Sequence, residues 1–581
     1  MMTMKKQIIA LLAGTMLTLG AAAQRPAPIQ YQFGGLAFNH DLMSSWDFGD
    51  ISRTQQFGTS RAMAMGSAFV SLGADLSSMA INPAGLGMYR SNELSITPVM
   101  DFARATTADT EAGLGSNHRN VFALGNFGAA INVHQDPTSA VTSVTVGFGM
   151  NRIADFNRRY SYSTALGYNP ESGAIPSIAD LYAHQLQWGE GGYPVFPNAG
   201  HGVHNPNGRL DFNGVSYFWP AVLAYKSALT HVTGWGDNRQ WERDAIGENA
   251  SMRRTADVIN KGSINEFSLS AGINIRNIVY IGATIGVQSV NKSDNVIYSE
   301  DYYYAPDQNG NEIAYAPDGR ALPAQLEYAD IWQRSELSGA GINIKLGVIV
   351  RPVAGLRLGA AFHSPTYYTL DRSYNAGINY KLYSHEDQRV IEEGIYSPTQ
   401  YDEMDFSWDF TSPARLMFGA SYTFGRMAII SVDYERAWYN GIRVHNAPGG
   451  NFTISPAQYK YDIRNSYCAT NTVRGGVEIK PISRLAIRFG GGYQSSMLAD
   501  GVEAIERPQT TESYYFTGGI GIRLSHRISL DAAYQQLTEH QSAYALFYEY
   551  NPYAGAYGLG SDLYETSFKR HFASLTLSYK F

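Results

Sequence analysis

Apolar and polar residues alternate in several stretches of this chain. Near its end, Leu575, Leu577 and Tyr579 share one face, while Thr576 and Ser578 occupy the other. A period of two predicts a β-strand with one apolar and one polar face. In the wall of a barrel the polar face would point into the lumen, and we expect substitutions at Thr576 and Ser578 to leave assembly intact. The same alternation recurs at 266–275, 341–350 and 415–424. The face opposite the apolar one is rich in Gly, Ser and Asn in these stretches. Such a small and polar inner face favours a barrel wall whose apolar outer face contacts lipid.

Fourteen such strands are predicted, an even number, as expected for a bacterial barrel made from one chain. They cover residues 93–104, 119–133, 141–152, 264–275, 278–290, 339–351, 355–363, 412–424, 427–438, 470–480, 483–494, 513–524, 527–536 and 570–581. The predicted fold is therefore all-β: a fourteen-stranded antiparallel transmembrane β-barrel formed by residues 93–581.

The predicted connections alternate in length. Those after every second strand have two to seven residues, whereas those between are longer, with the longest at 153–263. Short periplasmic turns and long outer loops are typical of outer-membrane barrels. A soluble β-sandwich also alternates its side chains, but it has no reason to alternate its loop lengths. The loop at 153–263 is therefore expected to be extracellular.

The first 23 residues have the features of a secretory signal peptide. Lys5 and Lys6 precede an apolar run, and three alanines end at Ala23. The run is shorter than the roughly 20 residues that a membrane-spanning helix needs. We therefore predict export, with the outer membrane of a Gram-negative bacterium as destination.

Residues 24–92 precede the first predicted strand and lack strong alternation. A barrel of fourteen strands has a lumen wide enough to leak unless something fills it. We expect this segment to fold inside the lumen as a plug, or hatch.

The hatch segment contains Asn82-Pro83-Ala84-Gly85, whose first three residues also occur at the pore of water channels. A water channel needs several apolar helices of about 20 residues, and none follows Ala23. Pro83 instead favours an extended Asn82, whose amide can bond neighbouring backbone, while Ala84 and Gly85 permit close approach to a wall. The alternative is that these residues form only a turn.

The stretch "GTSRAMAMGSAFVSLGADLSSMAINPAGL" at 58–86 resembles the N-terminal hatch of the FadL-type long-chain fatty acid transporters, which include aromatic-hydrocarbon transporters. Hairpins such as "SPARLMFGASYTFGRMAIISVDY" extend the resemblance over most strands, but the 153–263 loop matches nothing in the family. The resemblance implies an outer-membrane barrel that takes up hydrophobic small molecules, long-chain fatty acids first, with Asn82, Pro83, Ala84 and Gly85 as its hatch motif.

The end of the chain resembles the assembly signal of outer-membrane barrels. Leu577, Tyr579 and the terminal Phe581 carry that resemblance. It implies the barrel-assembly machinery and outer-membrane lipid as partners, besides the hydrophobic ligand.

Other functions find little support in the sequence. A net charge of -7 provides no basic footprint, so no nucleic acid partner is expected. There is no G-x-S-x-G or H-E-x-x-H motif, and no third ligand accompanies His201 and His204. His363, His526 and His571 are expected to be surface or interface histidines. We predict no enzyme activity, no catalytic residues, no metal and no cofactor.

Aromatic stretches at 215–225, 301–307 and 363–370 allow two interpretations. They fit an interfacial girdle or an exposed apolar groove that collects a lipid-like ligand. The sequence assigns no ligand-binding residue. The alternative function is a barrel that tethers surface or secretion-system proteins through its long loops.

Overall fold

The structure is a computed structural model. It describes residues 33–37, 42–55, 57–109, 113–169, 171, 174–188, 219–233, 240–306, 310–397, 404–448, 454–502, 507–551 and 556–581. The predicted signal peptide at 1–23 and the pair His201 and His204 lie outside these ranges.

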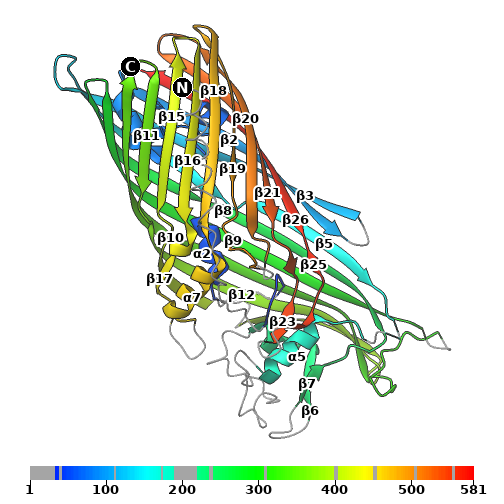
Figure 1. The fold of residues 1–581 in the computed structure, drawn as a ribbon. Coiled ribbons are helices and arrows are strands. Elements are labelled where there is room, and N and C mark those ends of the chain that lie inside the picture. The colour runs from blue at the N-terminus through cyan, green and yellow to red at the C-terminus, as the bar shows by residue number, and fades with distance from the viewer. Residues whose placement is uncertain are drawn as a thin grey trace, which may run out of the picture.

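A closed antiparallel barrel of fourteen wall positions forms most of the molecule (Figure 1). In order, the positions are β2 (Glu93–Asp109), β3 (Gly113–Gln135), β4 (Val141–Asp155), β8 (Ala250–Ile275), β9 (Val279–Tyr304), β10 (Ala324–Val353), β11 (Leu356–His363) with β12 (Tyr367–Ser384), β14 (Met404–Thr411) with β15 (Arg415–Phe424), β16 (Ala428–Trp438) with β17 (Arg443–Asn446), β18 (Ala469–Ile482), β19 (Leu485–Gln494), β20 (Thr510–Arg523), β21 (Ile528–Gln541) and β26 (Thr566–Lys580). Pairing of β2 with β26 closes the wall. Each of the fourteen predicted strands overlaps one position, so the fold class is confirmed.

Several strands are much longer than a membrane crossing requires. β8 and β9 have 26 residues each and β10 has 30, whereas about 9–11 tilted residues span a bilayer. These strands continue past one face of the membrane as an outer wall, seen at the lower right of Figure 1. Part of the region predicted as the loop 153–263 belongs to this wall.

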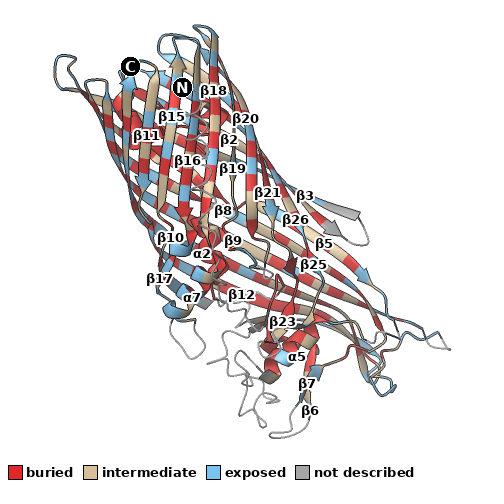
Figure 2. Ribbon diagram, viewed as in Figure 1, coloured by how far each residue is buried: buried red, intermediate tan, exposed pale blue. Residues whose placement is uncertain are grey.

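The two parts of β8 use opposite patterns. In the membrane part, Phe267 and Leu269 are exposed on the outside, while Glu266 and Ser268 are buried inside. In the outer part most inward residues, such as Val258, are apolar and buried, with Arg254 as a buried charged exception, and the outward residues are largely polar. Figure 2 shows the resulting alternation of buried and exposed residues along the wall. The apolar outer band places the barrel in a bilayer, and the inverted outer part encloses its own apolar core.

Two neighbouring wall positions are bent at Ser-Pro pairs. Ser364-Pro365 separates β11 from β12, and Ser412-Pro413 separates β14 from β15. Proline lacks the N–H that a ladder needs, so the serines keep the wall joined. The Thr366 N–H donates to Ser412 Oγ at 3.0 Å, and the Ile344 N–H donates to Ser364 Oγ at 3.0 Å.

One seam of the outer wall depends on side chains. In the described part of the chain, the outer half of β3 pairs only with β2, and β5 (Arg158–Leu166) pairs only with β8. Between them, the Asn117 side chain donates to Ser161 Oγ at 2.7 Å. The seam between β3 and β5 thus lacks a backbone ladder among these residues.

Smaller elements cover the end of the barrel formed by the outer wall. They are α5 (Ile178–Trp188), α6 (Trp219–Lys226), β6 (Thr230–Thr233), β7 (Gln240–Arg243), β13 (Arg389–Ser397), η4 (Tyr439–Gly441), α7 (Pro456–Ser466), β22 (Tyr544–Ala545), β23 (Tyr548–Asn551), β24 (Ala556–Gly560) and β25 (Leu563–Tyr564). α5 and α6 pack with the inner faces of the outer wall in the largest apolar cluster.

The N-terminal segment contributes five short elements. They are β1 (Phe33–Gly34), α2 (Ser45–Ser52), α3 (Ser60–Ala64), α4 (Ser78–Ile81) and η1 (Pro83–Met88). Most of the side chains from 57 to 88 are buried, although their helices are only four to six residues long. Contact with the wall, and not helix length, therefore holds this segment in shape.

Candidate functional site: a filled lumen below an amphipathic pocket

The N-terminal segment crosses the lumen and bonds to strands on different sides of it. The Ser60 N–H donates to Thr576 Oγ1 on β26 at 2.7 Å. The Val70 N–H donates to Asp433 on β16 at 2.8 Å, and the Tyr515 hydroxyl on β20 donates to the Gly66 carbonyl at 2.8 Å. Thr576 thus faces inward, as the alternation predicts, and contacts the segment. That its substitution leaves barrel assembly intact stays a prediction.

Asn82 lies where this segment meets β10 and β11. Its φ and ψ of -144° and 104° are extended, as expected of a residue before proline. The side-chain amide donates to the Val70 carbonyl at 2.6 Å and lies 3.3 Å from the Ala360 carbonyl. Its oxygen accepts from the Ala84 N–H at 3.1 Å. One buried side chain thus satisfies backbone groups of both the segment and the wall.

Pro83, Ala84 and Gly85 are buried, and wall glycines receive Asn82 and Pro83. A Cβ on Gly347 of β10 would lie 1.8 Å from Asn82 Oδ1, and one on Gly282 of β9 would lie 2.2 Å from the Pro83 carbonyl carbon. Any larger residue at these positions would displace the segment. The glycine-rich inner faces therefore form the surface on which the segment lies.

A polar chamber of about 680 Å³ lies beside this contact. Lys345 pairs with Glu266 inside it, and a ring nitrogen of His363 is 2.9 Å from the Ile81 carbonyl. His363 therefore faces the lumen, at the interface between the segment and the wall, and not the outer surface. The strand residues that line the chamber are mostly polar because side chains alternate along each strand, and the apolar ones face the lipid.

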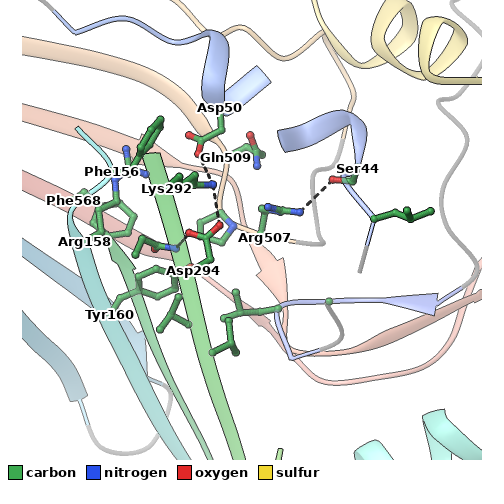
Figure 3. Close-up of a pocket in the computed structure, with 17 residues that line it drawn as sticks. Ser44, Asp50, Phe156, Arg158, Tyr160, Lys292, Asp294, Arg507, Gln509 and Phe568 are labelled. Atoms are coloured by element: carbon green, nitrogen blue, oxygen red, sulfur yellow. Dashed lines mark hydrogen bonds and ion pairs between the residues drawn. The ribbon is translucent and has the colours of Figure 1, made fainter. Parts of the chain in front are cut away.

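A second pocket lies between the N-terminal segment and the outer wall (Figure 3). It has about 830 Å³ of space, counting the part open to solvent. Phe156, Tyr160, Val258 and Phe568 line its apolar side. These residues come from the outer wall, whose inward side chains are mostly apolar.

Three cations also line this pocket, and two of them lie among its aromatic residues: the Arg158 guanidinium is 5.0 Å from the centre of the Phe568 ring. Lys292 of β9 lies between Asp50, at 3.2 Å, and Asp294, at 3.0 Å. Arg158 pairs with Glu539 at 3.2 Å, behind the pocket. The Lys292 ammonium lies 5.5 Å from the centre of the Phe156 ring, so cationic and apolar sides meet.

Arg507 is the third cation, and its guanidinium holds α2. It donates to Asp47 at 2.7 Å and to Ser44 Oγ at 3.2 Å, at the start of the helix. Its side chain is 22% exposed, against 12% for Arg158 and 7% for Lys292. Arg507 is thus the cation that an arriving anion reaches most easily.

The acidic partners keep their charge. Burial would raise the pKa of Asp50, but Lys292, Arg158 and Arg53 lower it below its ordinary value. The pKa of Asp47 is lowered in the same way by Arg507 and Arg372. The pocket therefore combines a hydrophobic wall with an ionised network at neutral pH, which suits an amphipathic ligand.

The sequence does not reveal these cations. Lys292, Arg158 and Arg507 lie in stretches predicted as loops, where charged residues are ordinary. The only signal is the even spacing of Lys292, Asp294 and Val296, which places all three on the inner face of an unrecognised extension of β9.

The tyrosines of the stretch 301–307 alternate between the inside and the outside of the wall. Tyr302 and Tyr304 are buried to 5% exposure, and Leu223 of α6 is fully buried. Tyr303 is exposed on the outside of the wall. The groove interpretation of 301–307 is therefore wrong, because alternate tyrosines point into the extracellular core.

The C-terminal residues predicted as an assembly signal lie on the outer surface. Leu577, Tyr579 and Phe581 are 47%, 39% and 53% exposed. The rings of Tyr579 and Phe581 stack with centroids 5.9 Å apart. They form an apolar strip at the end of β26 opposite the outer wall, and β26 closes the barrel against β2.

The described part of the chain lacks two further features. No helix in the described ranges is long and apolar enough to cross a membrane. Within the same ranges, no group of three or more His, Cys, Asp or Glu is placed to hold a metal ion.

Fold and site together define an outer-membrane β-barrel whose lumen is occupied by its own N-terminal segment. No model of a known protein family matches the chain, and no curated protein does. Among solved structures, a FadL homologue of Pseudomonas aeruginosa is 12% identical, with 96% of this chain and 99% of that chain covered and a TM-score of 0.49.

Two toluene transporters are also similar. TodX of Pseudomonas putida is 11% identical to this chain, with a TM-score of 0.45. The match covers 91% of this chain and 100% of TodX. TbuX of Ralstonia pickettii is 13% identical, covers 90% and 98%, and has a TM-score of 0.43. These structures are FadL-type channels, the family that the sequence resembles.

Proposed function

We propose that the chain carries hydrophobic small molecules, with long-chain fatty acids first, passively across the outer membrane. The observation that supports this most is the pocket above the lumen, where Phe156 and Phe568 face Lys292 and Arg507. An acyl chain fits the apolar side, and a carboxylate fits the cationic side. Burial of each CH₂ contributes up to about 0.8 kcal/mol.

We propose further that residues 24–92 act as the hatch, and that Asn82 to Gly85 anchor it. The pocket and the segment share Asp50 and Leu42, so a ligand in the pocket touches the element that fills the lumen. A ligand shifts the segment only as far as its affinity differs between the two positions. Binding at Arg507 competes with Asp47, which is how a carboxylate would loosen α2.

A displacement titration tests the proposal. Fatty acids of increasing length compete with a fluorescent analogue on the purified full chain, and affinity should rise with length until the pocket is full. Arg507→Gln should weaken the acids and leave the corresponding alcohols unchanged. A response that is flat with length would contradict transport of hydrophobic cargo and favour a barrel that tethers partner proteins.

A further inference from the structure

The largest of the described cavities lies at the opposite, periplasmic end of the lumen. It has about 1100 Å³ of space, again counting its open side. Residues of β18 to β21 and Lys580 of β26 form its wall, while Arg61 and Ala74 of the N-terminal segment close its inner end. We call this cavity the vestibule. It lies where a molecule passing the segment would emerge.

The vestibule is strongly basic in an acidic chain. Seven of its lining residues are Lys or Arg and two are acidic, whereas the whole chain has 44 basic and 51 acidic residues. A concave surface of one charge concentrates ions of the other.

The inner part of this charge is already balanced. Arg488 lies between Glu478 and Asp531, at 2.6 Å from each, and its side chain is 5% exposed. Arg61 approaches the same Glu478 at 3.4 Å. Glu478 thus connects the N-terminal segment to the wall, and any anion that binds Arg61 competes with it.

The outer part is not balanced. Arg484 lies in the turn between β18 and β19, while Arg523 and Arg527 flank the turn between β20 and β21. Within the described ranges, none of these three has a carboxylate at ion-pairing distance. Three exposed guanidinium groups around one opening form a site for an oxyanion, because each offers paired N–H donors.

We propose that the vestibule binds the oxyanion head, a carboxylate or a phosphate, of an amphipathic molecule that leaves the lumen. The proposal rests on the proposed transport function and narrows its cargo to molecules with one charged end. We call Arg484, Arg523 and Arg527 the rim arginines. A neutral hydrocarbon has no charged group that could bind to them. With cations at both ends of the filled lumen, a charged head passes from Arg507 to Arg61 and then to the rim.

A fluorophore on the rim tests the proposal directly. Ser483→Cys lines the vestibule, is exposed, and accepts a bimane label once Cys468→Ser removes the native thiol. The labelled full chain is titrated in detergent with dodecanoate, dodecyl phosphate, dodecanol and inorganic phosphate. We expect all three anions to shift the fluorescence, with a response that weakens as salt rises, and dodecanol to leave it unchanged.

Matched variants locate the site. Arg523→Gln with Arg527→Gln should lower the apparent affinity for dodecanoate at the rim by about 3- to 10-fold, since exposed charge pairs are individually weak. Arg426→Gln removes an exposed arginine from another periplasmic turn and should change nothing. No shift with any anion, or an equal shift with dodecanol, would overturn the proposal. A shift that appears only in nanodiscs with phosphatidylglycerol would assign the rim to lipid headgroups and overturn it too.

Uptake measurements separate this inference from the proposed function. Joining β3 to β5 with a short crosslinker between Asn117→Cys and Ser161→Cys closes the seam and should leave dodecanoate uptake intact. Uptake that stops would mean a sideways exit and contradict the vestibule as the way out. A length-independent displacement titration would instead contradict hydrophobic transport, even where the rim still binds phosphate.

Discussion

At the scale of single residues, a few buried polar side chains hold the N-terminal segment in the lumen. Asn82 is the clearest, because its amide bonds Val70 and Ala84 in the segment and reaches Ala360 in the wall. Buried backbone groups that lose such a partner cost about 1–3 kcal/mol. The segment therefore depends on one side chain at the point where its helices are shortest.

Asn82→Ala should loosen the segment without preventing assembly of the barrel, because no wall ladder includes Asn82. We expect normal heat-modifiability on a gel and increased entry of antibiotics that the outer membrane normally excludes. Unchanged exclusion would favour the simple-turn interpretation of these residues.

Gly347→Ala tests the same contact from the wall side. Its new methyl group would occupy the position of Asn82 Oδ1, so it should reproduce the leak of Asn82→Ala. Gly518→Ala is the control, since its Cβ would meet other atoms only at 3.8 Å. A leak with Gly518→Ala as well would show that loss of wall glycine, and not the Asn82 contact, is responsible.

At the scale of elements, the strands show which parts of the fold a sequence reveals. The membrane crossings are predictable, because lipid outside and water inside impose strict alternation. The outer halves of β8, β9 and β10 are not predictable in this way. Beyond the membrane their apolar residues move from the outward face of the strand to the inward face, so the alternation seen in the membrane part is broken. The Ser-Pro bends add a further change of phase, which ends the predicted strand at His363. Pocket residues such as Lys292 lie in those hidden extensions.

The last strand should be sensitive on its outer face near the middle of the bilayer. Leu575→Arg places a cation in lipid at a cost of about 2–4 kcal/mol near the midplane, and should reduce the heat-modifiable folded form. Ser578→Ala, on the inner face, should assemble normally. Similar losses for both would mean that the two faces of β26 are wrongly assigned.

Helix α7 should detach from α2 as the pH rises. Burial raises the pKa of Asp462 from 3.8 to about 7, so the docked helix favours the protonated acid. This stabilisation is complete below pH 3.8 and is lost as the pH rises through 7, by up to about 1.4 kcal/mol per pH unit between these values. The Tyr459 hydroxyl of α7 donates to the Met43 carbonyl beside α2 at 2.6 Å, so detachment reaches the N-terminal segment.

Hydrogen exchange of residues 456–466 measures this detachment. After correction for the intrinsic pH dependence, exchange should be faster at pH 8 than at pH 5. Asp462→Asn, which stays neutral, should remove the difference. A wild-type helix equally protected at both pH values would contradict the assignment.

At the scale of the whole molecule, the barrel separates two surfaces of different chemistry. An amphipathic pocket faces outward, a basic vestibule faces the periplasm, and the N-terminal segment lies between them. The direction of the barrel in the membrane therefore decides which site meets the cargo first.

Epitope tags test that direction. A tag between β12 and β13, at Glu386, should bind antibody on intact cells, because that hairpin belongs to the outer wall. A tag at Arg426, between β15 and β16, should bind only after the outer membrane is permeabilised. The opposite result would place the basic vestibule outside the cell.

The bonds between Ser60 and β26 also set an order of events in time. Ser60 contacts Ser574 and Thr576, which follow it by 514 and 516 residues in the chain. The part of the protein made first can therefore reach its final position only when the part made last has arrived. Contacts this distant in sequence form slowly. Each newly assembled molecule should thus pass through a state in which the strands already form a closed barrel but the N-terminal segment does not yet fill the lumen. The lifetime of this open state depends on how fast the N-terminal segment binds the wall.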